Sequence, residues 1–243
     1  MKHLALRKLS SRTALYLLAT SAFTFTLGAM TPARAADYGP NTVRVGLYSV
    51  FYHVSADPLS GPFVPPGELK LDVQNVETLY LAYVRDFGSH FNAELAFGVP
   101  PLTKTIARGP VTVGSVPYNG QIISTARWFS PSLVFSYLFL RPDSLVRPYL
   151  GVGFNYTSFY DRQSTAAGNA VAGGPTQLNL QSSLGPVGTV GFRFRLPRSF
   201  SAYLSYSFSG VRTHLTANTL GEIRTTNVSF GPEALVASVG YSF

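Results

Sequence analysis

The sequence predicts an all-β protein, an eight-stranded antiparallel transmembrane β-barrel with short periplasmic turns and long extracellular loops. Three observations predict this fold. Apolar and polar residues alternate with a period of two along segments of strand length. Charged residues make up only 12% of the chain, against 46% hydrophobic and 14% aromatic residues, whereas soluble domains carry about 25% charged residues. The connections between the segments alternate between short and long, as they do in outer-membrane barrels.

The N-terminal segment has the pattern of a signal peptide. A basic start is followed by a largely apolar stretch, residues 13–30, and then by Ala33-Arg34-Ala35, in which small residues flank the middle position. We expect residues 1–35 to be cleaved off after Ala35, leaving residues 36–243 as one barrel domain in the outer membrane of a Gram-negative bacterium. The alternative is an uncleaved membrane helix, because the stretch is near the lower limit of about 17–25 residues for a span.

The net charge of +8 falls to +3 without the leader. Five of the 19 Lys and Arg residues lie in residues 1–35, which leaves 14 basic against 11 acidic residues. These 14 are scattered along the chain rather than gathered on one face. We therefore expect no nucleic-acid partner.

Eight segments after the leader show the alternation of a strand. They are residues 41–54, 71–84, 90–99, 122–139, 148–161, 178–196, 200–215 and 228–243. The short connections are residues 85–89, 141–146 and 197–199, and the long ones are 55–70, 100–121, 162–177 and 216–227. No helical period is visible in any of them.

Each segment carries bulky apolar side chains on one face and mostly small ones on the other. In residues 90–99, Phe91 and Leu95 face one way, while Asn92 and Glu94 face the other. A soluble β-sandwich exposes charged side chains on its outer faces, but here the second face is rich in Gly, Ser and Thr. Bulky residues facing lipid and small ones filling a narrow barrel explain this pattern. The alternative is an exported soluble β domain with an aromatic core.

Aromatic residues near the strand ends are expected to form two girdles at the membrane interfaces. One charged residue disturbs the pattern, because Glu77 lies in phase with Leu79 and Leu81 on the presumed lipid face. Either Glu77 stands above the hydrocarbon or a bulge shifts the register of this strand. The expected girdle residues are Tyr83, Phe87, Phe91, Tyr137, Phe139, Phe200 and Phe243 on the periplasmic side, and Phe51, Phe97, Trp128, Phe129, Tyr156 and Tyr160 on the outer side.

The sequence offers little for catalysis. It contains no Cys, so thiol chemistry and thiolate metal sites are excluded. Beyond residue 35 the histidines are His53, His90 and His214, and no nucleophile elbow, phosphate-binding loop or zinc-protease motif is present. We expect no enzyme, no metal and no cofactor. The alternative is a lipid-modifying barrel that uses His53 or His214 with a nearby Ser.

Four stretches resemble the bacterial outer membrane protein W family, which includes an alkane-uptake protein. They are residues 147–161, residues 93–95 with 100–104, residues 130–133 and residues 238–243. The resemblance covers essentially the whole chain after the leader. It implies a monomeric eight-stranded barrel with a narrow hydrophobic lumen that passes small apolar molecules. The sequence departs from the family in its loops and at Gly231-Pro232-Glu233, where a charge stands in place of an expected aromatic residue.

The C-terminal residues resemble an assembly signal. Most outer-membrane barrels share a terminal pattern like Tyr241-x-Phe243, which the barrel-assembly machinery reads. We therefore expect this machinery as a partner, together with outer-membrane lipid and lipopolysaccharide.

An apolar solute is retarded by charged lipopolysaccharide, so a barrel assists its passage if the outer half of the lumen is apolar. Six inward residues are candidates for binding such a solute by burial, although the ordinary filling of a narrow barrel is the alternative. For Trp128 a second alternative is a girdle anchor facing lipid. The candidates are Val50, Tyr52, Trp128, Phe159, Val187 and Val211.

The lower lumen is expected to be closed by a polar plug of Arg44, Glu94 and Arg193. Solutes would then leave sideways, and Pro131, Pro186 and Pro232 mark candidate openings because each removes a ladder donor from a strand. Local bulging is the alternative. The expected function is passive uptake of small hydrophobic molecules, and the alternative is a non-transporting barrel whose loops act in adhesion or as a receptor.

Overall fold

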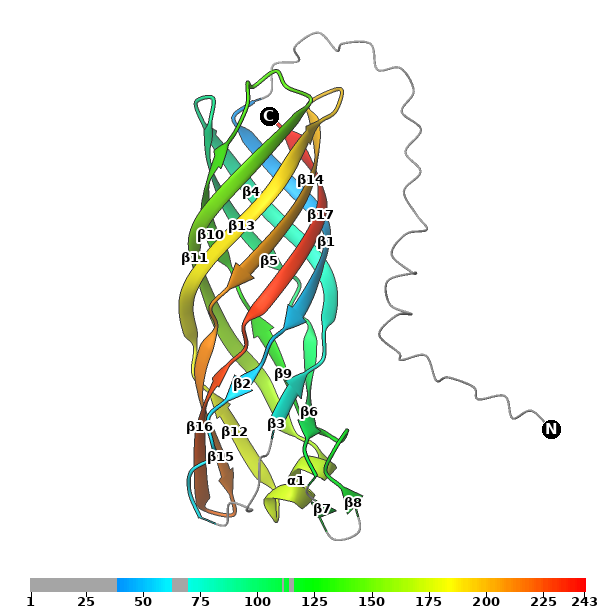
Figure 1. Ribbon diagram of the computed structural model, residues 1–243, viewed down its shortest axis with the longest axis vertical. Coiled ribbons are helices and arrows are strands. Elements are labelled where there is room, and N and C mark those ends of the chain that lie inside the picture. Colours follow the sequence, from blue (N-terminus) through cyan, green and yellow to red (C-terminus); the bar gives the residue numbers. More distant parts are fainter. Residues whose placement is uncertain (1–38, 63–69, 111, 114–115) are drawn as a thin grey trace, which may run out of the picture. The chain divides into compact units, whose positions relative to one another are not determined.

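The computed structural model describes residues 39–62, 70–110, 112–113 and 116–243. The expected signal peptide, residues 1–35, lies outside these residues. Within them, α1 (Ala166–Ala172) is the one helix and the rest of the regular structure is β (Figure 1). No helix in this part of the chain is both long and apolar enough to cross a membrane.

Eight strands close into an antiparallel barrel, which confirms the predicted fold class. Neighbours in the chain pair around the barrel, and the pairing of β1 with β17 closes the ring. Short turns join β4 to β5, β10 to β11 and β13 to β14 at the end drawn uppermost in Figure 1. The strands are β1 (Asn41–Tyr52), β4 (Val76–Phe87), β5 (Phe91–Gly98), β10 (Ser132–Leu138), β11 (Val146–Ser164), β13 (Ser183–Arg195), β14 (Phe200–Ser209) and β17 (Pro232–Ser242).

Toward the long loops the barrel continues as two separate sheets, drawn at the bottom of Figure 1, which we call the outer extension. One sheet has the order β12 (Thr176–Leu180), β15 (Arg212–Thr219), β16 (Glu222–Ser229) and β2 (Ser55–Ala56). The other joins the distal part of β11 to β9 (Ile122–Phe129), β6 (Leu102–Arg108) and β3 (Lys70–Val73). A short pair, β7 (Thr112–Val113) and β8 (Val116–Pro117), and α1 complete the outer extension.

The outer extension is more regular than the sequence predicted. Residues 100–121 contain β6, β7 and β8, and residues 216–227 belong to the β15–β16 hairpin. The hairpin turns at Leu220 and Gly221, whose φ values of 54° and 99° suit a two-residue turn. In residues 162–177, α1 was missed because seven residues are too few to display a helical period.

Five predicted strands are each divided in two at the level where the barrel becomes two sheets. We call this level the junction. It consists of residues 74–75, 130–131, 181–182, 210–211 and 230–231. Pro131, Gly210 and Gly231 are among these residues, and Pro and Gly both interrupt ladders because one lacks an N–H and the other a side chain.

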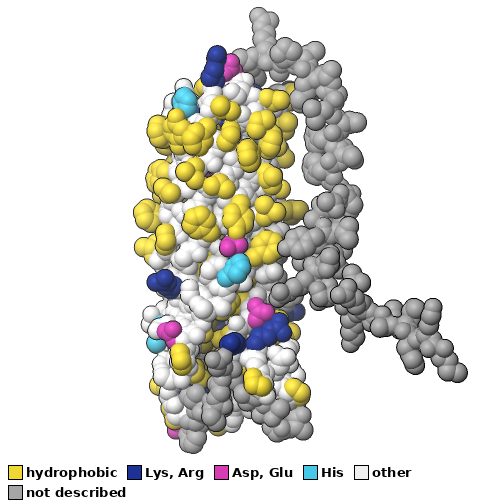
Figure 2. All heavy atoms as spheres, in the orientation of Figure 1, with side chains coloured by type: hydrophobic (Ala, Val, Ile, Leu, Met, Phe, Trp, Pro, Cys, Tyr) yellow, Lys and Arg dark blue, Asp and Glu magenta, His cyan; other side chains and the backbone are white. Residues whose placement is uncertain are grey.

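An apolar belt surrounds the barrel between the junction and the short turns. Leu47, Val152 and Phe154 are 68%, 67% and 61% exposed, and Figure 2 shows the belt as a band of hydrophobic side chains with charged groups at its margins. Phe87 and Phe200 stand exposed near the short turns, where a girdle was expected. A continuous exposed apolar belt of this kind requires lipid around it.

Glu77 is exposed on the outer face of β4. The pairing of β4 with β1 runs without a register shift from Val76 to Arg85, so the structure excludes the bulge. Glu77 lies opposite Ser49, beside the junction. The charge therefore stands at the outer margin of the belt.

Gly151 faces the inside of the barrel between Ser136 of β10 and Thr189 of β13, its partners on the two neighbouring strands. A Cβ added at Gly151 would stand 2.4 Å from Ser136 Oγ and 2.8 Å from Thr189 Cγ2. A larger side chain at this inward position would collide with the side chains of both neighbouring strands.

Candidate functional site

A buried ion pair closes the lumen toward the short turns. The Arg44 side chain, 1% exposed, pairs with the Glu94 carboxylate, which also accepts a hydrogen bond from the Tyr80 hydroxyl. Arg44 Nη2 donates to Ser238 Oγ at 2.8 Å. The guanidinium carbon lies 3.9 Å from the centre of the Tyr203 ring, within the range of a cation–π interaction. Arg44 is thus buried together with a counter-ion and further partners, which a buried charge requires.

A second ion pair lies nearer the short turns. Arg193 Nη1 donates to Asp86 Oδ2 at 3.0 Å, and its guanidinium carbon lies 5.7 Å from the centre of the same Tyr203 ring. Arg147 Nη2 donates to the Ser89 carbonyl at 2.6 Å. We call these two ion pairs with Tyr203 the floor. It confirms the predicted inward positions of Arg44, Glu94 and Arg193.

On the side of the floor that faces the outer extension lies an inner cavity of about 90 Å³. Near the floor its lining contains Glu94, Tyr48 and Tyr80, and toward the outer extension its lining contains Trp128 and Pro232. On the other side of the floor a vestibule of about 470 Å³ opens among charged residues, including Asp86, Arg147 and Arg193. The floor therefore separates the inner cavity from a vestibule lined by charged residues.

The outer cavity, about 220 Å³, lies between the two sheets of the outer extension. This volume far exceeds the ~15 Å³ that one water molecule needs. Leu178, Leu180 and Leu215 contribute from one sheet, and Leu71 and Val73 from the other. Most of the lining is aliphatic or aromatic, so an apolar solute would be buried here.

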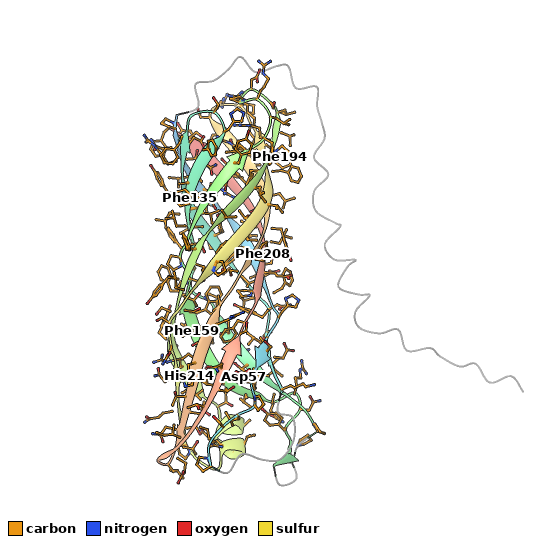
Figure 3. All side chains as sticks on the ribbon, turned by 60° about the vertical axis from the view of Figure 1, so that its left-hand side comes forward. Asp57, Phe135, Phe159, Phe194, Phe208 and His214 are labelled. Atoms are coloured by element: carbon orange, nitrogen blue, oxygen red, sulfur yellow. The ribbon has the colours of Figure 1, made fainter. Side chains whose placement is uncertain are left out.

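Aromatic side chains lie where the two cavities adjoin, and we call this level the neck. Trp128 lines both of them and meets Tyr52 edge-on, with the ring centres 6.3 Å apart. Phe159 and Phe230 lie with their ring centres 5.5 Å apart and line the outer cavity, and Figure 3 shows Phe159 at this level of the molecule. Trp128 Nε1 is buried. The structure therefore places Trp128 inward, and its assignment to the lipid-facing girdle was wrong.

All six residues that the sequence singled out for the lumen line a cavity. Val50 and Val187 line the inner cavity, while Tyr52, Phe159 and Val211 line the outer one, and Trp128 belongs to both. Their position agrees with the expectation. Their role in holding a solute stays a prediction.

The three prolines lie in different surroundings, Pro131 in the junction, Pro186 within β13 and Pro232 at the start of β17. At Pro186 the Gly210 N–H donates to the proline carbonyl at 3.0 Å, and Pro232 pairs with Tyr52 at the start of β17. At both prolines the wall is closed and the pairing has no register shift, so the structure shows neither an opening nor a bulge there.

Pro131 lies beside an interruption of the wall. The pairing of β10 with β5 ends at Ser132 and Ala96, and pairing resumes only between Leu102 and Arg127. Among the described residues, no backbone hydrogen bond crosses this stretch from Phe97–Gly98 to Ser130–Pro131. Residues on both sides of the interruption line the inner cavity.

Two cavity residues escaped the sequence analysis. Arg162 and Arg224 both line the outer cavity, but the sequence placed them in loops. In β16 the apolar Ile223 is exposed and the charged Arg224 is buried. An apolar residue next to a charged one in this segment was the available sign of a strand with an inward-facing cation.

None of the three histidines that the structure describes lines either cavity. His53 Nδ1 lies 3.7 Å from a Glu233 carboxylate oxygen, and His214 Nδ1 lies 3.0 Å from Asn227 Oδ1. Among residues 39–62, 70–110, 112–113 and 116–243, no group of three or more His, Asp and Glu side chains is arranged to hold a metal.

A closed eight-stranded barrel with an exposed apolar belt, an enclosed lumen and a charged floor defines a small membrane β-barrel of the outer-membrane type. Its family follows from the comparison with known sequences. The model of the OmpW family matches residues 42–243, so the chain belongs to this family, as the four matching stretches had indicated.

Curated relatives agree. Outer membrane protein W of Vibrio cholerae is 27% identical over 212 residues, which cover 87% of this chain and 92% of that protein. The dibenzothiophene metabolism operon protein PahQ of Pseudomonas aeruginosa is 28% identical over 130 residues, which cover 52% of this chain and 56% of that protein. Several relatives are thus named outer membrane proteins of Gram-negative bacteria.

Solved structures share the fold. The outer membrane protein OprG of Pseudomonas aeruginosa aligns with a TM-score of 0.74 at 20% identity, over 85% of this chain and 97% of that one. The outer membrane protein AlkL in lipid bilayers aligns with a TM-score of 0.60 at 22% identity, over 89% and 97%. At these identities the alignments show the common barrel.

Proposed function

We propose that this barrel takes up small hydrophobic molecules passively, admits them from outside through the outer cavity, and releases them sideways into the membrane. One observation supports this most strongly. The outer and inner cavities lie in series, share Trp128, Ser130 and Pro232, and end at the buried Arg44–Glu94 pair. A solute that enters this path reaches a closed end inside an apolar belt.

Burial supplies the driving force for entry. Each Å² of apolar surface removed from water contributes about 25 cal/mol, and the outer cavity offers aliphatic side chains from both sheets. The path begins beyond the belt, so a solute bypasses the charged headgroup layer that would otherwise retard it. Because the floor closes the lumen, ions and water have no straight pore through the barrel.

Release is proposed at Pro131. Here the wall between β5 and β9–β10 lacks backbone pairing, and the inner cavity is lined by Phe97, Gly98 and Ser130 from both sides of the interruption. Without a ladder to break, separating these edges costs fewer hydrogen bonds than anywhere in the paired wall. An apolar solute would then pass into lipid, which solvates it well.

The relatives are compatible with this role. PahQ is named a dibenzothiophene metabolism operon protein, and dibenzothiophene is an apolar aromatic compound. The family that the sequence resembles likewise includes an alkane-uptake protein. We further propose that the chain is not an enzyme, because the three histidines in its described part stand away from both cavities.

Assembly completes the proposal. Tyr241 and Phe243 are 50% and 56% exposed at the end of β17, where the barrel-assembly machinery would reach them. We propose that a cleaved leader, residues 1–35, exports the chain, and that the barrel acts as a monomer surrounded by lipid and lipopolysaccharide.

Uptake of a labelled alkane into liposomes with and without the protein tests the conduit. Trp128→Ala should lower the initial uptake rate at equal protein level, because it removes the largest ring of the neck. Phe129→Ala is the matched control, since Phe129 is 40% exposed on the outer face of the same strand and should leave uptake unchanged. Uptake that is the same with and without the wild-type protein would favour the alternative of an adhesion or receptor barrel.

A cross-link tests the lateral exit. The natural chain has no Cys, so Gly98→Cys with Ser130→Cys can be joined across the interruption by a bifunctional thiol reagent. Cross-linking should slow uptake relative to the same variant left uncross-linked. Ala96→Cys with Ser132→Cys, a pair already opposite each other in the closed wall, should respond little. Equal uptake after cross-linking the first pair would contradict exit at Pro131.

A further inference from the structure

The outer cavity contains a buried cation that the conduit does not require. Arg224, 7% exposed, extends from β16 into the cavity lining. Its Nη2 donates to the Ala172 carbonyl at 2.9 Å and to Thr219 Oγ1 at 2.6 Å. Its Nε is buried and has no hydrogen-bond partner among the described residues. A guanidinium has five N–H donors, so Arg224 retains donor capacity inside the cavity.

A second cation lines the same cavity. Arg162 Nη1 donates to the carbonyls of Phe159 and Leu180, at 3.3 and 3.2 Å. Neither Arg162 nor Arg224 forms an ion pair with any residue that the structure describes. Both contrast with Arg44 and Arg193 of the floor, each of which has a carboxylate partner.

One carboxylate also lines the outer cavity. Asp57 is exposed, and its Oδ2 accepts a hydrogen bond from the Asn227 side-chain amide at 3.1 Å. Figure 3 shows Asp57 in the outer extension, among the strands drawn there. The cavity lining therefore carries two cations against one solvated anion. A cation buried without a counter-ion is costly, and an anionic ligand removes that cost.

We propose that the outer cavity binds amphipathic carboxylates of the fatty-acid type, with the carboxylate held by Arg224. The inference rests on the proposed function, because it takes the outer cavity to be the entry site for apolar chains. The Nε–H of Arg224, which is without a partner among the described residues, can donate one charge-assisted hydrogen bond to a carboxylate oxygen. Arg162 adds positive potential to the same cavity.

The position of Arg224 sets where the alkyl chain lies. Arg224, Thr226 and Val228 are the buried residues of β16 and share one face of the strand. Phe230 follows at the neck, six residues from Arg224, which corresponds to about 20 Å at about 3.3 Å per residue. A chain anchored at Arg224 would therefore extend along Val228 toward Phe159 and Trp128. Long-chain acids should occupy the whole distance, and short ones only the outer part.

Quenching of tryptophan fluorescence tests this geometry, since Trp128 is the only Trp. The protein is placed in phosphatidylcholine nanodiscs and titrated with ω-bromododecanoate and ω-bromododecanol, whose bromine quenches the indole when the chain end approaches the neck. The carboxylate should quench saturably, with an affinity roughly tenfold above that of the alcohol, as expected for one charge-assisted hydrogen bond. ω-Bromododecyl trimethylammonium should bind more weakly than either.

Variants assign the difference to one residue. Arg224→Met should bring the carboxylate down to the affinity of the alcohol, while Arg224→Lys should retain part of the preference. Arg212→Met is the matched control, because Arg212 is an exposed cation of the outer extension outside the cavity lining. Mobility of unboiled protein on SDS gels verifies that each variant is folded, and the wild-type comparison of acid with alcohol decides the question if Arg224→Met does not fold.

The outcomes separate the two proposals. Equal affinity of acid and alcohol in the wild type, or an unchanged preference in folded Arg224→Met, overturns the carboxylate site and leaves the hydrophobic conduit intact. Saturable quenching by neither probe overturns both proposals.

Discussion

The floor makes a quantitative prediction about stability. Glu94→Gln removes the negative charge beside Arg44, whose side chain is 1% exposed against 16% for Glu94. Breaking a buried pair by removing one partner costs about 3–5 kcal/mol, because the other charge remains buried and uncompensated. Arg44 keeps its hydrogen bonds to Ser238 and its position over Tyr203. We therefore expect a loss at the lower end, about 3 kcal/mol.

The assay is urea unfolding in lipid vesicles, followed by Trp128 fluorescence. A double variant, Arg44→Met with Glu94→Gln, should be less destabilised than Glu94→Gln alone, because no unpaired charge is left inside. Glu222→Gln serves as the control, since Glu222 is exposed in the outer extension and a surface change of this kind stays within about 0.5 kcal/mol. A loss of unfolding free energy below about 1 kcal/mol for Glu94→Gln would refute the role given to the pair. A loss in the double variant equal to the sum of the losses in Arg44→Met and Glu94→Gln would refute it as well.

Three further predictions concern the barrel itself. Phe243→Asp should lower the amount of protein in the outer membrane, measured by fractionation, and normal insertion would contradict its role as an assembly signal. Leu204→Arg, on the belt, should lower the unfolding free energy by about 2–4 kcal/mol, whereas Ser205→Asn, facing the inner cavity, should be tolerated. Equal stability of these two variants in vesicles would invert the assignment of inside and outside. Gly151→Val should cost about 1–3 kcal/mol through overpacking, because a Cβ there already meets Ser136 Oγ on the neighbouring strand at 2.4 Å, and unchanged unfolding would show that the neighbouring side chains move aside.

The barrel could be predicted from the sequence because lipid and lumen impose opposite demands on successive residues. Phe91 and Asn92 illustrate this, since Phe91 is 59% exposed to the membrane side and Asn92 8% exposed in the lumen. The pleat fixes a period of two, so the sequence of each strand shows which of its residues face lipid and which face the lumen. The inward positions of Arg44, Glu94 and Arg193 followed from the same phase, whereas Asp86, which belongs to β4, had been assigned to a short turn.

The outer extension could not be predicted in the same way. Outside the membrane neither face of a strand is restricted to apolar residues, so Thr and Asn occur on both sides of β15 and β16 and the alternation fades. Arg224 was therefore assigned to a loop. Trp128 posed a different difficulty, because an indole suits both a lipid interface and a lumen, and only the pairing of β9 with β11 decides between them.

The junction also divides the protein by the surroundings to which each part responds. The strands of the belt must match the thickness of the bilayer, and a thinner or thicker membrane strains or tilts them. The two sheets of the outer extension lie beyond the belt and are held by their own ladders. If solutes enter and leave as proposed, a bacterium that remodels its lipids would thus act on release at the wall beside Pro131 and leave entry through the outer cavity unchanged.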